Sequence, residues 1–283
     1  MGLTKADIAA RARELKADGY GLCVASNREV LERLETRPFG VEVAALDFLG
    51  PQQADWSVAD LMRVYNVLNA TAFGEKGIPL QNWVMIDLGL LPSAFLLITL
   101  PLAAVPAAIA APRLSAAARG RAEHVLSAVL AEARRLDYKG PIPVAGYCAA
   151  PTPIPGGWVG WSLCSAISGL GTTAKGLGLE IYRSRTLTGV AQFSDQGLRV
   201  HRRFGPMQIM AAVLDLHPVP HTMVYRTEVH QPDQERSPTT WMDCRDLAVQ
   251  REMQAKIDAG VSRFYILSPG LVDGQVPILE LAN

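Results

Sequence analysis

The segment from Trp158 to Pro206 constrains the fold of this chain more than any other part of the sequence. Trp158–Ala166 is apolar and aromatic, as is typical of a buried strand, and Gly169-Leu170-Gly171 predicts a tight turn after it. Thr172–Arg183 has apolar residues at helical spacing, and Thr188–Phe193 predicts a short second strand. This succession of strand, glycine turn, helix and strand favours an α/β fold built on a mixed sheet.

A second helix is expected directly after that strand. Asp195 is the expected N-cap, Leu198, His201 and Arg202 recur at helical spacing, and Gly205-Pro206 is expected to end the helix.

The glycine turn before the first helix has two interpretations. The N–H groups at a helix N-terminus carry partial positive charge, and glycine allows a phosphate to come close to them. The same glycines also suit an ordinary strand-to-helix turn with tight packing. The sequence alone leaves both interpretations open.

Two parts of this segment resemble the GNAT superfamily of acyl-CoA-dependent N-acyltransferases. Ala166–Gly171 is similar to the pyrophosphate-binding turn of that family, Gln/Arg-x-x-Gly-x-Gly/Ala. Ser194–Pro206 is similar to its closing helix, Asn-x-x-Ala-x-x-Leu-Tyr-x-x-x-Gly-Phe. Ala166 stands where the family has Gln or Arg, His201 stands where it has its tyrosine, and Pro206 replaces the final Phe.

The resemblance implies a mixed central sheet flanked by helices, with a GNAT-like core at residues 38–230. Residues 1–37 would form an N-terminal helical extension, and residues 231–283 a C-terminal helix and hairpin. The implied function is transfer of an acyl group to an amine or similar nucleophile of a small molecule. The implied donor is acyl-CoA or acetyl-CoA, or an acyl group on the prosthetic arm of an acyl carrier protein, with no metal. The two extensions would shape the acceptor site or a homodimer contact.

The resemblance also implies the role of each site residue. The main chain of Trp158–Ala166 would hold the pantetheine amides. The pyrophosphate would bind at Ser165, Ala166, Gly169, Leu170, Gly171, Thr172 and Thr173. His201 would protonate the departing thiolate, because imidazole exchanges protons near neutral pH. A polar side chain packed between strands is the structural alternative for His201.

Two other classes of function stay open. One is a non-catalytic acyl-CoA-binding or regulatory module with the same fold. The other is a metal-dependent enzyme, since His201, His217, His221 and His230 lie close together in the sequence. Pro218 and Pro220 oppose a helical His-x-x-x-His pair, and two strand residues four apart are separated by about 13 Å.

The charge composition excludes some partners. The 27 basic and 27 acidic residues balance, which argues against a nucleic-acid-binding surface or a polybasic membrane surface. The local basic cluster is interpreted either as a solvated helix face or as a patch for the phosphates of coenzyme A or of a carrier protein's arm; it comprises Arg199, Arg202 and Arg203, together with Lys175, Arg183 and Arg185. The four cysteines include no Cys-x-x-Cys pair, and Met1–Lys16 does not have the pattern of a signal peptide, so a cytoplasmic location is expected.

Residues 88–111 contain no charged residue, which raises the question of a membrane span. Pro92, Pro101 and Pro106 oppose one long helix, so buried strands followed by an apolar loop are expected, and these could line an apolar-substrate pocket.

Elsewhere the periodicity predicts helices at 1–18, 57–73, 115–136 and 242–259, a helix starting at Ser26-Asn27, and strands at 41–49, 83–91, 95–100, 142–150, 207–216, 221–229, 263–267 and 276–281.

Overall fold

The computed structural model describes residues 3–26, 47–49, 54–73, 94–213, 222–231 and 237–283. The chain divides into two compact units, each assembled from separated stretches of sequence. The first unit comprises Met1–Thr4, Thr152–Gly160 and Ser184–Asn283, and the second comprises Lys5–Pro151 and Trp161–Arg183. Strand β5, Gly157–Ser165, therefore contributes residues to both units. The boundaries expected at residues 37 and 230 stay predictions.

The second unit contains a sheet with the strand order β2-β1-β3-β4-β5. Its strands are β1 (Gly21–Ser26), β2 (Asp47–Leu49), β3 (Ala94–Leu100), β4 (Ile142–Pro151) and the second part of β5. β1 pairs in parallel with β2 and antiparallel with β3, and β3 pairs antiparallel with β4. Every residue of β3 is buried, which explains its continuous apolar sequence.

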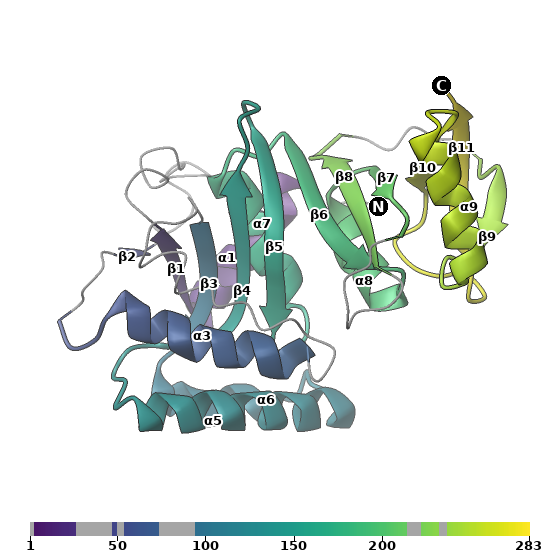
Figure 1. Cartoon of the computed structure of the whole chain (residues 1–283). Helices are drawn as coiled ribbons and strands as arrows, with labels where there is room; N and C mark the ends of the chain where they lie inside the picture. Colours follow the sequence, from purple (N-terminus) through teal and green to yellow (C-terminus); the bar gives the residue numbers. More distant parts are fainter. Residues whose placement is uncertain (1–2, 27–46, 50–53, 74–93, 214–221, 232–236) are drawn as a thin grey trace. The chain divides into compact units, whose positions relative to one another are not determined.

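Helices cover both faces of this sheet (Figure 1). Tyr65 of α3 (Val58–Phe73) lies over Gly146 of β4, where a Cβ atom would overlap the tyrosine ring. The next strand residue, Tyr147, packs against Gly178 of α7 (Leu170–Ile181). Successive strand residues point to opposite faces, so α3 and α7 lie on opposite sides of the sheet.

Two further helices of the second unit pack on α3 and α7. Helix α6 (Ala116–Arg135) contacts α3, and α1 (Lys5–Ala17) contacts α7. The apolar residues at helical spacing are buried on α1 (Ile8, Ala9, Ala12 and Leu15) and on α3 (Leu61, Val64, Tyr65 and Leu68). The hydroxyls of Ser57 and Ser115 accept hydrogen bonds from the first turns of α3 and α6, as expected for N-caps.

The first unit contains a sheet with the strand order β5-β6-β8-β7-β10-β11-β9. Its further strands are β6 (Thr186–Gln192), β7 (Met207–Ala211), β8 (Thr222–Glu228), β9 (Thr240–Met242), β10 (Ser262–Ile266) and β11 (Val276–Ala282). β5 and β6 pair in parallel, from Gly157 opposite Thr186 to Gly160 opposite Gly189. The other neighbours pair antiparallel.

The helices of the first unit are α8 (Asp195–His201), the 3-10 helix η4 (Arg202–Phe204) and α9 (Leu247–Asp258). Gly189, Tyr225, Ile209 and Phe264 lie opposite one another on consecutive strands, so they share one face of the sheet. Helix α8 packs against β6, and α9 packs against β7 and β10.

The expected mixed α/β architecture is confirmed, with mostly antiparallel sheets, and several boundaries need correction. Ser194, not Asp195, is the N-cap of α8, because its side chain accepts the N–H of Gly197. The helix expected over 242–259 begins at Leu247, after a short strand that the sequence reading missed. Ser26 ends strand β1, so the helix expected from Ser26-Asn27 does not begin at Ser26, and the rest of it lies outside the described residues. The strand expected over 83–91 lies outside them too, as does most of the strand expected over 41–49.

The described part of the uncharged stretch begins with β3 and continues as two short helices. The expected apolar loop is wrong, because Leu102–Ala104 forms the 3-10 helix η3 and Val105–Ile109 forms α5. Pro106 lies in the first turn of α5, where its missing N–H removes no helical hydrogen bond. Within the residues that the structure describes, no helix combines the length and the apolar character needed to cross a membrane.

Candidate functional site

The glycine turn leads from β5 into α7 as the sequence predicts. Gly169 is the N-cap of α7 and has a φ of 86°, a left-handed conformation that glycine adopts without strain. Ser168 and Gly169 are exposed, whereas Leu170 is fully buried and anchors the first turn of the helix. The start of α7 is therefore exposed to solvent, and the buried side chain of Leu170 holds its backbone in place.

Two N–H groups at this helix start have no hydrogen-bond partner among the described residues, those of Gly171 and Thr172. The N–H of Leu170 donates to Ile167 O at 3.3 Å, and that of Thr173 donates to Gly169 O at 3.4 Å. Gly171 has no side chain to cover this position. These two N–H groups are the ones that an anion at the N-terminus of α7 would meet.

The other predicted pyrophosphate residues are used within the fold. The N–H of Ala166 donates to Val144 O, and the hydroxyl of Ser165 donates to Ile167 O. The hydroxyl of Thr173 donates to Gly169 O at 3.3 Å, which closes the first turn. Of the seven predicted residues, Gly171 and Thr172 thus fit direct phosphate contact best, and the others shape the turn.

His201 lies at the C-terminal end of α8 in the first unit and is half-buried. Its Nδ1 atom lies 2.7 Å from the hydroxyl oxygen of Tyr225 on β8, and the two rings are in contact with centroids 5.0 Å apart. This contact joins the helix to the centre of the sheet. The turn and His201 belong to different units, and each is described within its own unit.

Tyr225 and Gly189 form the support beneath His201, and the sequence reading did not single out either residue. Gly189 lies directly opposite Tyr225 on β6, where a Cβ atom would be 2.7 Å from the tyrosine hydroxyl. The phenol can therefore cross its neighbour strand only because that position is glycine. An isolated glycine within a strand pattern is the signal that could have revealed this close approach.

The basic cluster does not form one phosphate-binding patch. The buried guanidinium of Arg202 donates to Ile266 O at 2.7 Å and to Gly205 O at 3.0 Å. Arg199 pairs with Asp195 at 2.6 Å, and Lys175 is fully buried in α7. Arg202 and Lys175 are therefore structural, which corrects both interpretations for these two residues, whereas Arg199 and Arg203 are exposed, as expected of a solvated helix face.

Two cysteines of the second unit, Cys148 and Cys164, are poor nucleophiles. Cys148 and Cys164 are buried, and burial raises the pKa of the Cys148 thiol well above its usual range and that of Cys164 to about 12. The hydroxyl of Tyr65 lies 3.2 Å from that of Ser162 on the same face of the sheet. This cluster fills the space between β5 and α3.

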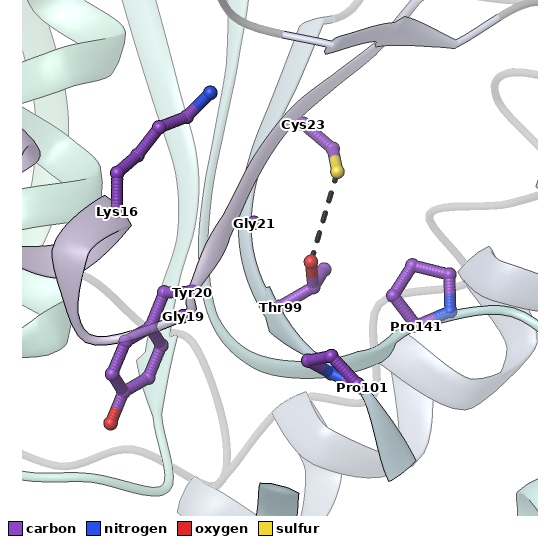
Figure 2. Close-up of a pocket in the computed structure, with 8 residues that line it drawn as sticks. All are labelled: Lys16, Gly19, Tyr20, Gly21, Cys23, Thr99, Pro101 and Pro141. Atoms are coloured by element: carbon purple, nitrogen blue, oxygen red, sulfur yellow. Dashed lines mark hydrogen bonds between the residues drawn. The ribbon is translucent and has the colours of Figure 1, made fainter. Parts of the chain in front are cut away.

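A hollow of about 380 Å³ opens at one end of the second unit's sheet (Figure 2). The turn Gly19–Gly21 lines it together with Cys23 and Thr99, whose sulfur and hydroxyl oxygen are 3.8 Å apart. Lys16, Pro101 and Pro141 complete the lining. Thr99 and Pro101 come from the uncharged stretch, but no residue of the glycine turn lines this hollow.

The histidine cluster is only partly described. His217 and His221 lie outside the described residues, and His230 occupies a turn with a φ of 58°. The described parts of the chain contain no group of three or more His, Cys, Asp or Glu side chains placed to hold a metal ion.

Comparison with known proteins gives no relative for this chain. No protein-family model, curated protein or solved structure matches it.

Proposed function

We propose that this chain transfers an acyl group from acyl-CoA, or from an acyl thioester on a carrier protein, to an amine or similar nucleophile of a small molecule. The observation that carries the proposal is the run of β5, glycine turn, α7, parallel strand β6 and α8, with two unpartnered N–H groups at Gly171 and Thr172 among the described residues. The pairing of β5 with β6 ends at Gly160, before β5 itself ends. This short pairing supports the comparison with the GNAT family, whose central strand is splayed.

The anionic end of the donor would bind at the start of α7. A pyrophosphate there would accept hydrogen bonds from the N–H groups of Gly171 and Thr172 and would meet the positive end of the helix dipole. Gly171 has no side chain of its own at this helix start, and a Cβ atom added there would make only an ordinary contact with Ser165 Cβ at 3.4 Å, so a longer side chain can be placed there without a clash at its Cβ. Binding therefore depends on backbone groups, and the missing Gln or Arg at Ala166 removes only one side-chain contact.

His201 would supply the proton for the leaving group. The acceptor nitrogen forms a bond to the thioester carbonyl carbon, and the C–S bond of the tetrahedral intermediate then breaks. The thiolate sulfur takes a proton from the His201 imidazolium. The proton that the acceptor nitrogen gives up returns through solvent to the imidazole, so the products are an amide and a thiol.

Thermal unfolding with and without acetyl-CoA and longer acyl-CoAs tests donor binding. A ligand at 100 times its dissociation constant stabilises the folded protein by about 2.7 kcal/mol, which gives a clear shift of the midpoint. Gly171→Glu is the informative variant. A carboxylate in the first turn suits the helix dipole, so the free protein stays folded while the anionic donor is repelled.

Gly120→Glu is the matched control, because Gly120 lies on an exposed part of α6 with no atom within 4 Å of its added Cβ. We expect Gly171→Glu to abolish the acyl-CoA shift and Gly120→Glu to keep it. Acyl transfer to a panel of amines then separates an enzyme from a binding module, which would bind acyl-CoA without turnover. An equal shift in both variants would contradict the assignment of the turn.

A further inference from the structure

The two helices of the first unit that pack on its sheet lie on the same face. Helix α8 is on the face of Tyr225, because His201 contacts that tyrosine ring. Helix α9 is on this face too, because Lys256 donates at 3.2 Å to Glu280, which lies opposite Phe264. Since Phe264 and Tyr225 share one face of the sheet, neither α8 nor α9 covers the other face.

The uncovered face of β5, β6, β8 and β7 is called the open face below. These four strands are neighbours in the sheet, in that order (Figure 1). Successive strand residues alternate between the two faces, so the open face carries the residues that flank the covered ones. Its central side chains are Val159 on β5, Thr188 and Val190 on β6, Val224, Arg226 and Glu228 on β8, and Gln208 on β7.

Apolar side chains gather at the centre of the open face. Val190 lies directly opposite Val224, and Met210 is the extra residue of the β7 bulge beside this pair. Val159 is 37% exposed, Met210 40% and Val190 45%. The solvent face of an antiparallel sheet is usually polar, and exposed apolar side chains that gather on one surface mark an interaction site.

The charges on the open face favour a second copy of this chain as the partner. Its central side chains include one cation and one anion, Arg226 and Glu228, which pair at 2.9 Å. Without a net charge, this surface does not suit a phosphate backbone or an anionic membrane. A two-fold interface uses the same patch on both copies, so the patch must be complementary to itself. An apolar centre beside one charge of each sign meets that requirement, because each copy offers both a cation and an anion to the other.

We propose that two copies of this chain dock through their open faces to form a symmetric dimer. This inference does not depend on the proposed acyl transfer. Four strands about 4.8 Å apart, of at most seven residues within the first unit, cover about 400 Å² in plan, against about 800 Å² per partner in a standard interface. We therefore expect a weak dimer with a dissociation constant in the micromolar range.

Sedimentation velocity of the full-length protein, from about 1 μM to about 1 mM, tests the proposal. The mass should rise with concentration from that of one chain, 30.5 kDa, towards that of two. Val190→Lys is the informative variant, because Val190 is on an inner strand of the open face and each copy would bring one ammonium group into the contact. We expect the dissociation constant to rise at least about tenfold.

Val261→Lys is the matched control. Val261 is 56% exposed and lies directly before β10, outside the open face. It should leave the dissociation constant unchanged. Thermal unfolding of both variants shows whether each is folded.

A pair of charge variants tests whether the partner is a second copy. Arg226→Glu leaves two anions on the open face and Glu228→Arg leaves two cations, so each variant alone should stay monomeric. An equal mixture of the two should form a dimer with one copy of each, because the two faces then attract one another. This pair decides the question even where Val190→Lys does not fold.

Two results would overturn the proposal. A wild-type chain that stays monomeric at about 1 mM would exclude a second copy as the occupant, and the open face would then belong to a different partner. A dimer that Val190→Lys weakens no more than Val261→Lys, and that both charge variants still form alone, would use another surface of the chain.

Discussion

Arg202→Met should destabilise the first unit strongly, although Arg202 belongs to a cluster that looks like a surface patch in the sequence. Its guanidinium is buried and donates to Ile266 O at 2.7 Å and Gly205 O at 3.0 Å, with a longer contact to Leu267 O at 3.5 Å. These bonds join the end of α8 to β10.

The expected loss in the free energy of unfolding follows from these contacts. A hydrogen bond to a charged group contributes about 1.5–3 kcal/mol, so two well-formed bonds give about 3–6 kcal/mol. The long contact adds little. Burial of the methionine side chain recovers about 1.5 kcal/mol, so the expected net cost is about 1.5–4.5 kcal/mol. That is a large part of a typical folding free energy of about 5–15 kcal/mol.

Urea denaturation measures the total loss, and hydrogen exchange of the β10 amides shows whether the loss lies in the first unit. The exchange measurement matters because a chain with two units need not unfold in one step. Arg203→Met is the control, since the neighbouring Arg203 is exposed. A cost for Arg202→Met no larger than that for Arg203→Met, together with a lost acyl-CoA shift, would refute the structural role and restore the phosphate patch.

Two further predictions concern buried residues of the second unit. Burial lowers the pKa of Lys175 in the folded protein well below its usual 10.5. Between that lowered pKa and the pKa of the unfolded chain, the unfolded chain binds a proton that the folded chain lacks, so the free energy of unfolding rises with pH. In urea titrations between pH about 7 and about 9, the free energy of unfolding of Lys175→Met should rise less with pH than that of the wild type. An equal rise in both proteins would contradict the role of Lys175. Gly146→Ala should cost about 1–3 kcal/mol, because its Cβ overlaps Tyr65, and a double-mutant cycle with Tyr65→Leu should recover most of the cost. Additive effects would show that the overlap does not matter.

Regular periodicity made much of the fold predictable from sequence. The buried apolar faces of α1 and α3 could be predicted directly from the sequence, because a helix that packs on one side needs apolar residues every three or four positions. The glycine turn and α7 were predictable for a similar reason, since a strand followed by two glycines and an amphipathic run has few alternatives.

The features that could not be predicted depend on contacts between distant residues. Ser194 and Asp195 are both good N-caps, and the choice between them depends on where the chain leaves β6. The burial of Arg202 depends on carbonyls more than sixty residues later in the chain. Tyr225 becomes the partner of His201 only after β8 pairs with β6, which no local pattern reveals.

The interleaved composition of the two units has a consequence for synthesis on the ribosome. The second unit lacks Trp161–Arg183 until more than half of the chain has been made, and the first unit waits for Ser184–Asn283. The N–H of Leu3 donates to Arg203 O, about two hundred residues later in the sequence, at 2.9 Å. Neither unit can therefore be completed early and released as a finished module. We expect folding to be slow, as for other chains whose contacts are far apart in sequence.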